Sequence, residues 1–469
     1  MVVIDTQSKK IILVSPYEIG RQPFGLAHPA ACLQAAGFEV RCVDLSLQRI
    51  TPDMLEDAAL VGLYLAMHTA TRIAVEAIPK LKQHSNGACF CAFGLYAPMN
   101  ASLLHELGVT EVIGGEYETR LLEIAERLHA GDDVLTPQST TSLSGVQFRV
   151  PLRDSLPSLD QYASLLLAEG GERTIGFAET TRGCKHLCRH CPVVPVYEGR
   201  FKAIPRDIVL TDIDNQVAAG ARHISFGDPD FLNGPTHALR IVAEMHRRHP
   251  ALSFDATIKV EHLLTHSTLL PALKENGCAL VITAVEAIDD HVLQLLDKGH
   301  TGAQFDQAIR LLRDVGIDVS PTFMPFTPWT TIEGYRALLT KLIELALVES
   351  VAPVQLVIRL LVPAGSKLLE LDGFEDLMQP FDSSLLGFPW QHQDPAVDAL
   401  HAKLQGLVET GEAEGLSRPQ LFEQIWQATH EALGEVVPAL PDFMGHPVAR
   451  LSETWYCCAE PTSQQLEGI

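Results

Sequence analysis

The sequence predicts an α/β protein with a doubly wound N-terminal domain, a partial (β/α)6 barrel and a mainly helical C-terminal region. Over about the first 135 residues, short apolar runs alternate with amphipathic stretches, and this pattern restarts on a larger scale near residue 173. Beyond residue 370 the pattern becomes helical and irregular. The predicted parts are residues 1–135, a linker at 136–172, the barrel at 173–370 and the C-terminal region at 371–469.

Alternating strands and helices in the N-terminal part indicate a parallel sheet covered on both faces. The strands are expected at 10–16, 39–45, 59–66, 89–94 and 111–115. The helices are expected at 29–37, 71–83, 100–108 and 116–131. The following segment is rich in Ser, Thr, Pro and Asp, and we expect it to be a connector.

The barrel is predicted from six strand candidates with amphipathic helices between them. The strands are expected at 174–180, 223–228, 253–258, 279–286, 317–323 and 354–360. The clearest helices are expected at 206–220, 236–249 and 305–316. In a barrel of this kind, functional residues lie where the strands end and their loops converge.

Composition limits the classes of function. The chain of 469 residues has 35 Lys and Arg against 58 Asp and Glu, a net charge of −23, so nucleic acid is not an expected partner. No apolar run reaches membrane-spanning length, and the N-terminal stretch lacks the features of a signal peptide. We therefore expect a soluble cytoplasmic protein with no membrane partner. In that reducing compartment, clustered cysteines favour a metal or catalytic site over disulfides.

Three cysteines follow the first barrel strand in the stretch TRGCKHLCRHC. The spacing of Cys184, Cys188 and Cys191 suits three corners of a cubane iron-sulfur cluster, leaving the fourth iron without a protein ligand. The alternative is a zinc site with His186 or His190 as fourth ligand. A zinc knuckle usually has a second pair of ligands and stabilises a small fold. This loop instead lies at the start of a large barrel that does not need a metal for stability, which favours the cluster.

This cysteine loop and barrel resemble the radical S-adenosylmethionine (SAM) superfamily over about 200 residues. The resemblance implies a 4Fe-4S cluster on the three cysteines and SAM as cofactors. It implies that the unligated iron chelates the amino and carboxylate groups of SAM, and that an electron from the cluster breaks a carbon-sulfur bond. It also implies an electron donor such as flavodoxin or ferredoxin.

The stretch FGDPD, at the end of the second barrel strand, resembles the superfamily segment that hydrogen-bonds the SAM amino group. The resemblance implies that Gly227, Asp228 and Asp230 bind SAM. The alternative is a simple turn, because glycine, aspartate and proline are all good turn formers.

Four further side chains are candidates for the SAM site. The resemblance places Glu286 at the end of the fourth strand and Lys298 before a turn, and it suggests Arg359 as a partner for the SAM carboxylate or a substrate. His190 stands where many members carry an aromatic residue near adenine. The alternatives are an ion pair at the barrel rim for Glu286 and a buried salt bridge for Arg359.

A doubly wound domain before such a barrel resembles the cobalamin-dependent members of the superfamily. The Asp-x-His-x-x-Gly signature that supplies an axial histidine in many cobalamin proteins is absent, and His28 occurs in a different context. Bound cobalamin and a domain that only shapes the active-site entrance are both kept as alternatives.

The C-terminal stretch WYCCAEP resembles the tail of the radical SAM group with a Cys-Cys-Ala-Glu-Pro ending. That group includes the enzyme of arsinothricin biosynthesis, which implies transfer of the 3-amino-3-carboxypropyl group of SAM to arsenite, with Cys457 and Cys458 as catalytic thiols. Neighbouring thiolates are suited to a soft centre such as trivalent arsenic. The alternatives are a vicinal disulfide or inert thiols in the tail, a cobalamin-dependent methyltransferase, and a non-catalytic metal or metalloid binding protein.

Overall fold

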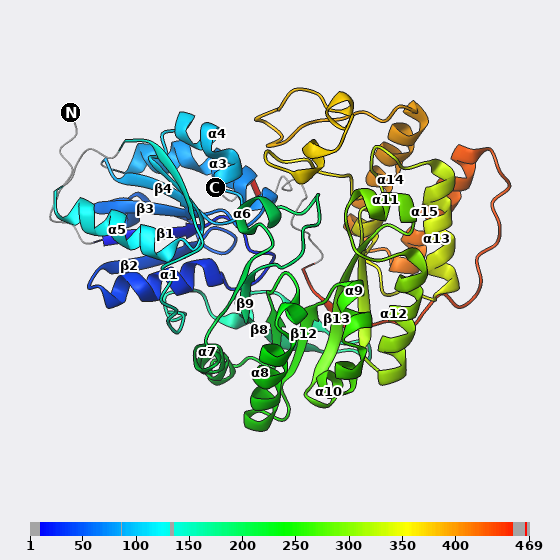
Figure 1. Cartoon of the computed structure of the whole chain (residues 1–469), viewed down its shortest axis with the longest axis horizontal. Helices are drawn as coiled ribbons and strands as arrows, with labels where there is room; N and C mark the ends of the chain where they lie inside the picture. Colours follow the sequence, from blue (N-terminus) through cyan, green and yellow to red (C-terminus); the bar gives the residue numbers. More distant parts are fainter. Residues whose placement is uncertain (1–9, 86, 132–135, 454–464, 467–469) are drawn as a thin grey trace.

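Two parallel sheets organise the molecule, one in the N-terminal domain and one in the barrel, and a helical region follows at the opposite end (Figure 1). The structure is a computed structural model that describes residues 10–85, 87–131, 136–453 and 465–466.

The N-terminal sheet has the strand order β2-β1-β3-β4-β5-β6, and every neighbouring pair is parallel. Its strands are β1 (Lys10–Ser15), β2 (Glu39–Asp44), β3 (Ala58–Tyr64), β4 (Cys89–Phe93), β5 (Glu111–Gly115) and β6 (Gln138–Ser142). The larger helices are α1 (Phe24–Ala35), α3 (His68–His84), α4 (Ala101–Glu106) and α5 (Glu118–His129). One face packs against α1 and α5 and the other against α3 and α4, which confirms the doubly wound arrangement.

The segment 136–172, expected to be a connector, supplies a strand to each sheet. Its first strand is β6, and its second is β7 (Ser164–Leu166), which pairs with the first barrel strand. The polar composition of β6 misled the prediction because this strand lies at an exposed edge of its sheet.

The barrel sheet has the order β14-β13-β12-β11-β8-β7-β15, with five parallel strands and two antiparallel strands at one edge. The parallel strands are β8 (Glu172–Ala178), β11 (His223–Phe226), β12 (Ser253–Thr257), β13 (Cys278–Glu286) and β14 (Asp318–Phe323). The prediction of a sixth strand at 354–360 is wrong. Its place is taken by a 3-10 turn at Pro353–Leu356 and a single parallel bridge between Phe326 and Arg359.

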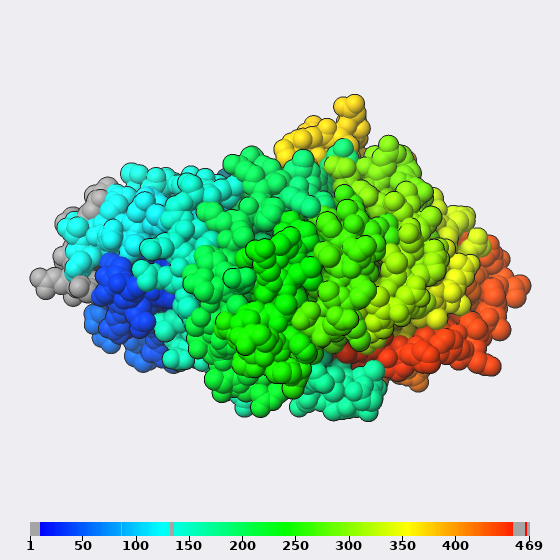
Figure 2. Space-filling view, turned by 60° about the horizontal axis from the view of Figure 1, so that its bottom comes forward, coloured from blue at the N-terminus to red at the C-terminus, as the bar shows by residue number. Residues whose placement is uncertain are grey.

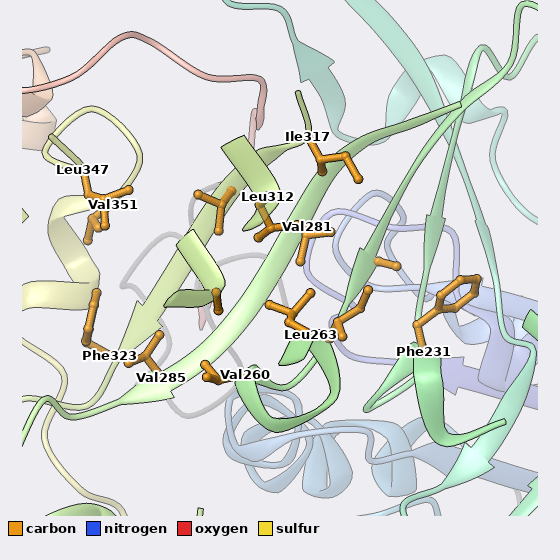
Figure 3. Close-up of a cluster of buried hydrophobic side chains, with 14 of the residues drawn as sticks. Phe231, Val260, Leu263, Val281, Val285, Leu312, Ile317, Phe323, Leu347 and Val351 are labelled. Carbon is orange, nitrogen blue, oxygen red and sulfur yellow. The ribbon is translucent and has the colours of Figure 1, made fainter. Parts of the chain in front are cut away.

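The helices that follow the barrel strands place apolar side chains in the barrel core, except the helix at 290–295, which packs with Met324, Ile358 and Trp390. They are α7 (Arg206–Ala218), α8 (Pro235–Arg248), α9 (Val260–Thr265), α10 (Leu270–Glu275), α11 (Asp290–Leu295), α12 (Gly302–Val315) and α13 (Ile332–Glu344). Figure 3 shows side chains of this core, including Val281 of β13 and Leu312 of α12. Helix α12 begins with a capping box at Thr301 and ends at Gly316, whose φ of 73° suits glycine.

The C-terminal region contains α14 (Pro395–Ala413) and α15 (Arg418–Leu433), and α15 packs against α13. The chain then runs along the barrel surface (Figure 2) to β15 (Arg450–Leu451), which pairs with β7. Among the described residues, no helix combines the length and apolar character required to cross a membrane.

Candidate active site

The cysteine loop lies at the C-terminal end of the first parallel strand, as predicted. It follows β8 and the short strand β9 (Thr181–Gly183), and Gly183 has a φ of 77°. A Cβ at Gly183 would collide with the backbone oxygen of Arg200, so this turn requires glycine. The loop then presents Cys184 and Cys188 as buried thiols and Cys191 as a half-buried thiol.

Backbone hydrogen bonds hold the loop against the barrel. The Cys191 N–H donates to the carbonyl of Cys188, and the Arg189 N–H donates to the carbonyl of Leu296 after α11. The Arg189 guanidinium donates to the carbonyls of Gln294 and Leu295. These contacts fix the middle of the loop from the side of the fourth barrel unit.

The three thiols fit the ligand set of an iron-sulfur cluster. None of them is in a disulfide, and Cys184 Sγ lies 3.7 Å from Oδ1 of Asn233. Burial raises the pKa of Cys184 to about 11 and that of Cys191 to about 12. Protonated thiols do not bind iron, so the positive charge of bound iron would have to stabilise these thiolates. Lys298 also lowers the pKa of Cys191, although this effect is smaller than that of burial.

Beside the thiols, the structure brings together His190, Glu286 and Lys298. Glu286 Oε1 lies 3.2 Å from Lys298 Nζ and 3.3 Å from His190 Nε2. Burial favours the neutral carboxyl, but Lys298 and His190 outweigh it and hold the pKa of Glu286 well below its ordinary value. The pKa of Lys298 is raised because Glu286 outweighs the opposing effect of burial. The pair is therefore ionised next to the cysteine loop.

The backbone at Glu286 is unusual. Its φ is 69°, and the register between β13 and β14 shifts at this residue. A left-handed conformation is costly for a glutamate, and such strained residues are concentrated at functional sites.

The FGDPD stretch has a different role at each position. A Cβ at Gly227 would collide with the ring of Phe177, so glycine is needed for packing. Asp228 accepts hydrogen bonds from the hydroxyls of Thr180 and Thr181 and from the Thr180 N–H, and burial raises its pKa to about 6. The Asp228 carboxylate thus connects the segment between β8 and the cysteine loop to the end of β11.

Asp230 lies between two imidazoles. Its Oδ2 is 3.2 Å from His186 Nε2 and 2.7 Å from His262 Nδ1, while its Oδ1 accepts from the Leu232 N–H. Burial would raise the pKa of Asp230, but these histidines lower it to about 2. Because His186 directs Nδ1 to within 3.5 Å of Glu261, both of its ring nitrogens face carboxylates. This arrangement argues against His186 as a zinc ligand beside the three cysteines.

Arg359 makes its contacts with a different set of residues. Its guanidinium donates to Asp398 Oδ1 at 2.7 Å and to the Trp390 carbonyl, and it stacks on the Trp390 ring at 3.6 Å. Arg359 therefore forms a salt bridge, which was the alternative to a role in SAM or substrate binding, although the pair is partly exposed and not buried.

Three contributors at the mouth were missed by the sequence analysis. His262 belongs to α9, Asn233 follows FGDPD, and Lys259 precedes α9 with its amine 3.3 Å from Glu261. Asn233 Oδ1 accepts from the Lys185 N–H within the cysteine loop. The signal for these residues was their position directly after barrel strands, where polar side chains gather at the mouth.

A buried ionic cluster joins the barrel to the N-terminal domain. Arg182, just before Cys184, pairs with Glu118 at 2.6 Å and Glu116 at 3.4 Å, and both glutamates follow β5. Its guanidinium also lies over the rings of Phe24, Tyr117 and Phe148. Since Arg182 and the glutamates follow strand ends, the C-terminal edges of the two sheets face each other here.

His28 lies in this same interface and is fully buried. Its Nδ1 is 2.6 Å from Glu118 Oε1, and its Nε2 accepts from the Arg149 N–H at 3.2 Å. Both ring nitrogens are therefore occupied, and His28 does not fit the role of an axial ligand to cobalt.

The predicted catalytic cysteines, Cys457 and Cys458, lie outside the described residues. Of the flanking residues, Ser452 is held at the edge of the barrel sheet, whereas Glu453 and Leu466 lie beside the N-terminal domain. The Ser452 N–H donates to the carbonyl of Ser164 in β7, and the side chain of Glu453 lies beside Gly20 in the loop after β1. On the other side, Leu466 packs on the N-terminal core.

Comparison with known proteins identifies the barrel. Residues 178–341 match the family model of the radical SAM superfamily, whose members use a 4Fe-4S cluster and SAM. The chain is 24% identical over 193 residues to tRNA-2-methylthio-N(6)-dimethylallyladenosine synthase of Haemophilus influenzae (strain PittEE), covering 39% of this chain and 40% of that protein. A putative methylthiotransferase of Methanocaldococcus jannaschii is 24% identical over 304 residues, covering 61% and 64%. The chain thus spans less than two thirds of the length of these relatives.

Solved structures show a similar fold over most of the chain. The radical SAM methyltransferase TsrM from Kitasatospora setae, with cobalamin and a [4Fe-4S] cluster bound, has a TM-score of 0.58 at 19% identity, covering 72% of this chain and 73% of its own. Apo OxsB, a cobalamin-dependent SAM radical enzyme, has a TM-score of 0.69 at 13% identity, covering 91% and 72%. The likeness extends beyond the barrel, which confirms the predicted α/β architecture.

Proposed function

We propose that the protein is a radical SAM transferase that moves the 3-amino-3-carboxypropyl group of SAM to trivalent arsenic. The observation that carries this proposal is the adjacent thiol pair Cys457 and Cys458, in a stretch flanked by Glu453 and Leu466, which both lie beside the N-terminal domain. Vicinal thiolates bind a soft metalloid far better than oxygen donors do. In this proposal, Cys457 and Cys458 are the thiols that bind the acceptor.

A cavity beside these ends supports the proposal. Its volume is about 460 Å³, and its lining includes Tyr17, Ser46, Glu453 and Gln465. This volume is sufficient for a small molecule. The loop after β1, which includes Tyr17, also reaches the barrel, because the Arg21 guanidinium lies 5.2 Å from the centre of the Phe177 ring.

The cluster, when bound, supplies an electron that breaks a carbon-sulfur bond of SAM. In the transfer, the bond between sulfur and the aminocarboxypropyl carbon breaks, a carbon-arsenic bond forms, and methylthioadenosine leaves. Breaking the carbon-sulfur bond with one electron turns the sulfonium into a thioether and leaves an aminocarboxypropyl radical. This radical supplies one electron of the new carbon-arsenic bond and the arsenic lone pair supplies the other. The remaining arsenic electron would return to the oxidised cluster, so arsenic passes from +3 to +5 and the overall transfer is redox neutral. A donor of the flavodoxin or ferredoxin class provides the electron that first reduces the cluster.

The chain's own residues prepare this site. Cys184, Cys188 and Cys191 hold the cluster, and the ionised Glu286 and Lys298 lie beside the cysteine loop with hydrogen-bonding capacity for the amino and carboxylate groups of SAM. His190 offers a planar ring next to them. We assign Glu286, Lys298 and His190 to SAM binding.

The test is anaerobic turnover of SAM with and without arsenite. We expect methylthioadenosine that depends on arsenite and matches the carbon-arsenic product in amount. Cys457→Ser with Cys458→Ser should retain iron and SAM binding but lose the transfer, whereas Cys32→Ser in α1 is the matched control with full activity. If 5′-deoxyadenosine forms with or without arsenite, the arsenic assignment is wrong.

A cobalamin-dependent methyltransferase is the second candidate, and the fold likeness to TsrM and OxsB favours it. Under this alternative, protein produced with cobalamin uptake carries a corrinoid absorption band, and SAM turnover yields S-adenosylhomocysteine. His28→Gln should leave the band unchanged, because both ring nitrogens of His28 already have partners. Full activity in cobalamin-free protein would eliminate this candidate. The acidic net charge of −23 argues against an RNA substrate.

A further inference from the structure

Three side chains from three separate elements converge beside the cysteine loop. His186 belongs to the loop, Asp230 follows β11 and His262 belongs to α9. One potential ligand atom from each lies within 4.8 Å of the other two. Asp230 is fully buried and His262 is 3% exposed. The first and last of them are more than 70 positions apart in the sequence, so the fold alone brings them together.

Their contacts are short but are not hydrogen bonds. Asp230 Oδ2 is 2.7 Å from His262 Nδ1 and 3.2 Å from His186 Nε2. Within the described part of the chain, none of these three buried atoms has a hydrogen-bond partner of ordinary geometry. Buried polar atoms without partners are uncommon in proteins, and each one calls for an explanation.

A shared cation accounts for the short distances and for the missing hydrogen bonds. Ligand atoms bonded to one ion at about 2.0–2.2 Å lie about 2.8–3.5 Å apart, close to the observed 2.7 and 3.2 Å, and their lone pairs point at the ion and not at each other. We propose that His186, Asp230 and His262 bind a divalent first-row transition cation. Two imidazoles and one carboxylate suit zinc or iron(II), whereas calcium and magnesium prefer sites made entirely of oxygen.

The surroundings match those of a metal ligand set. The second ring nitrogen of His186, Nδ1, faces Glu261 Oε2 at 3.5 Å, and Glu261 lies 3.3 Å from Lys259 Nζ. Metal-bound histidines usually direct their second nitrogen to a carboxylate or carbonyl, which fixes the ring. Asp230 Oδ1 is separately engaged by the Leu232 N–H, so Oδ2 is the oxygen available to the cation.

This site is distinct from the cluster, because it uses no thiol. It joins the cysteine loop to the end of β11 and to α9, elements that the Arg189 contacts do not reach. Three protein ligands also leave at least one coordination position for water or another small ligand. The site does not depend on which group of SAM is transferred or on the acceptor.

The test uses full-length, cluster-loaded protein carrying Cys457→Ser and Cys458→Ser, so that the tail thiols cannot bind the probe. Zinc is the probe because it binds nitrogen and oxygen sites more tightly than iron(II). After incubation with Zn²⁺ and desalting, we expect one zinc per chain. X-ray absorption at the zinc edge should show nitrogen and oxygen neighbours at about 2.0–2.1 Å and no sulfur near 2.3 Å.

Two variants and one control make the test specific. His262→Gln and Asp230→Asn should lose the zinc while keeping their iron content, and the amide oxygen introduced by Asp230→Asn can still accept the hydrogen bond from the Leu232 N–H. His266→Gln is the matched control and should keep the zinc, because His266 lies one turn further along, with its ring 5.3 Å from that of His262. Equal zinc in His262→Gln and the parent protein, or a sulfur shell in the spectrum, would overturn the proposal.

Discussion

The two sheets turn the same edge toward each other, but their polar side chains are arranged differently. At the N-terminal edge, opposite charges pair: Arg182 lies against Glu118 and Glu116 and is surrounded by three aromatic rings, although each glutamate keeps one buried oxygen without a hydrogen-bond partner in the described structure. At the barrel edge, the thiols form no disulfide among the described residues, and Asp230 lies between two histidines with unpartnered atoms on all three side chains. The first group is held together by a buried guanidinium, whereas the second consists of side chains that can all act as metal ligands.

This difference separates structural roles from chemical roles on one continuous surface. Buried charges that pair within the protein add rigidity or specificity but have little capacity left for a ligand. Buried groups that lack protein partners remain available for metals and cofactors. We therefore expect substitutions at the barrel edge to affect cofactor content and turnover, and substitutions at the N-terminal edge to affect stability.

The largest effect is expected at the cysteine loop. Changing Cys184, Cys188 or Cys191 to Ala removes one of the three proposed cluster ligands, so SAM cleavage should be abolished. The unchanged protein should contain about four iron and four sulfide per chain after anaerobic reconstitution. Iron analysis and product chromatography measure both quantities, and Cys278→Ala in β13 is the control. Zinc in place of iron at this loop would show that the three cysteines do not hold an iron-sulfur cluster.

The cysteine loop also shows how far the sequence alone could lead. The spacing of three thiols after a strand predicted the loop's position, because strand ends define the barrel mouth. The contact between His186 and His262 could not be predicted, because it depends on where α9 packs. The apolar run at 354–360 predicted a strand, yet such short runs do not distinguish strands from other buried segments. Here a proline begins a 3-10 turn, and only Arg359 forms a bridge.

A smaller effect is expected at the ionised pair beside the loop. Glu286→Gln removes the charge that pairs with Lys298, and hydrogen bonds to charged groups contribute about 1.5–3 kcal/mol, so the Kd for SAM should rise about 10- to 100-fold. Equilibrium binding to cluster-loaded protein measures this change. Glu333→Gln, at an exposed position in α13, is the control. An unchanged Kd would mean that Glu286 forms only an ion pair at the barrel rim and does not bind SAM.

At the N-terminal edge, Glu118→Gln should lower stability without removing the cluster. Breaking a buried ion pair costs about 3 kcal/mol of unfolding free energy. Burial opposes ionisation of Glu118, but Arg182 and His28 lower its pKa from 4.5 to about 2. Its folded pKa is below its unfolded value, so its stabilisation is present above pH 4.5 and is lost as the pH falls toward 2.

Denaturant unfolding as a function of pH checks this expectation. The difference between Glu118→Gln and the unchanged protein should be largest near neutral pH and should shrink below about pH 4.5. Glu123→Gln is the control, since Glu123 is 53% exposed and pairs with Arg120 at the surface, where ion pairs contribute less than about 1 kcal/mol. A difference that does not depend on pH would mean that packing, and not charge, gives Glu118 its effect.

The smallest effect on SAM is expected at Arg359, although it belongs to the barrel. Its guanidinium is already held by Asp398, the Trp390 carbonyl and the Trp390 ring, which resembles the opposite-charge pairs of the N-terminal edge. Arg359→Gln should therefore change the Kd for SAM by less than about twofold, which is within the effect of a weak surface ion pair. The same binding measurement used for Glu286→Gln provides the comparison. A tenfold loss of SAM affinity would show that Arg359 exchanges Asp398 for the SAM carboxylate, and would place this residue among the ligand-binding groups of the mouth.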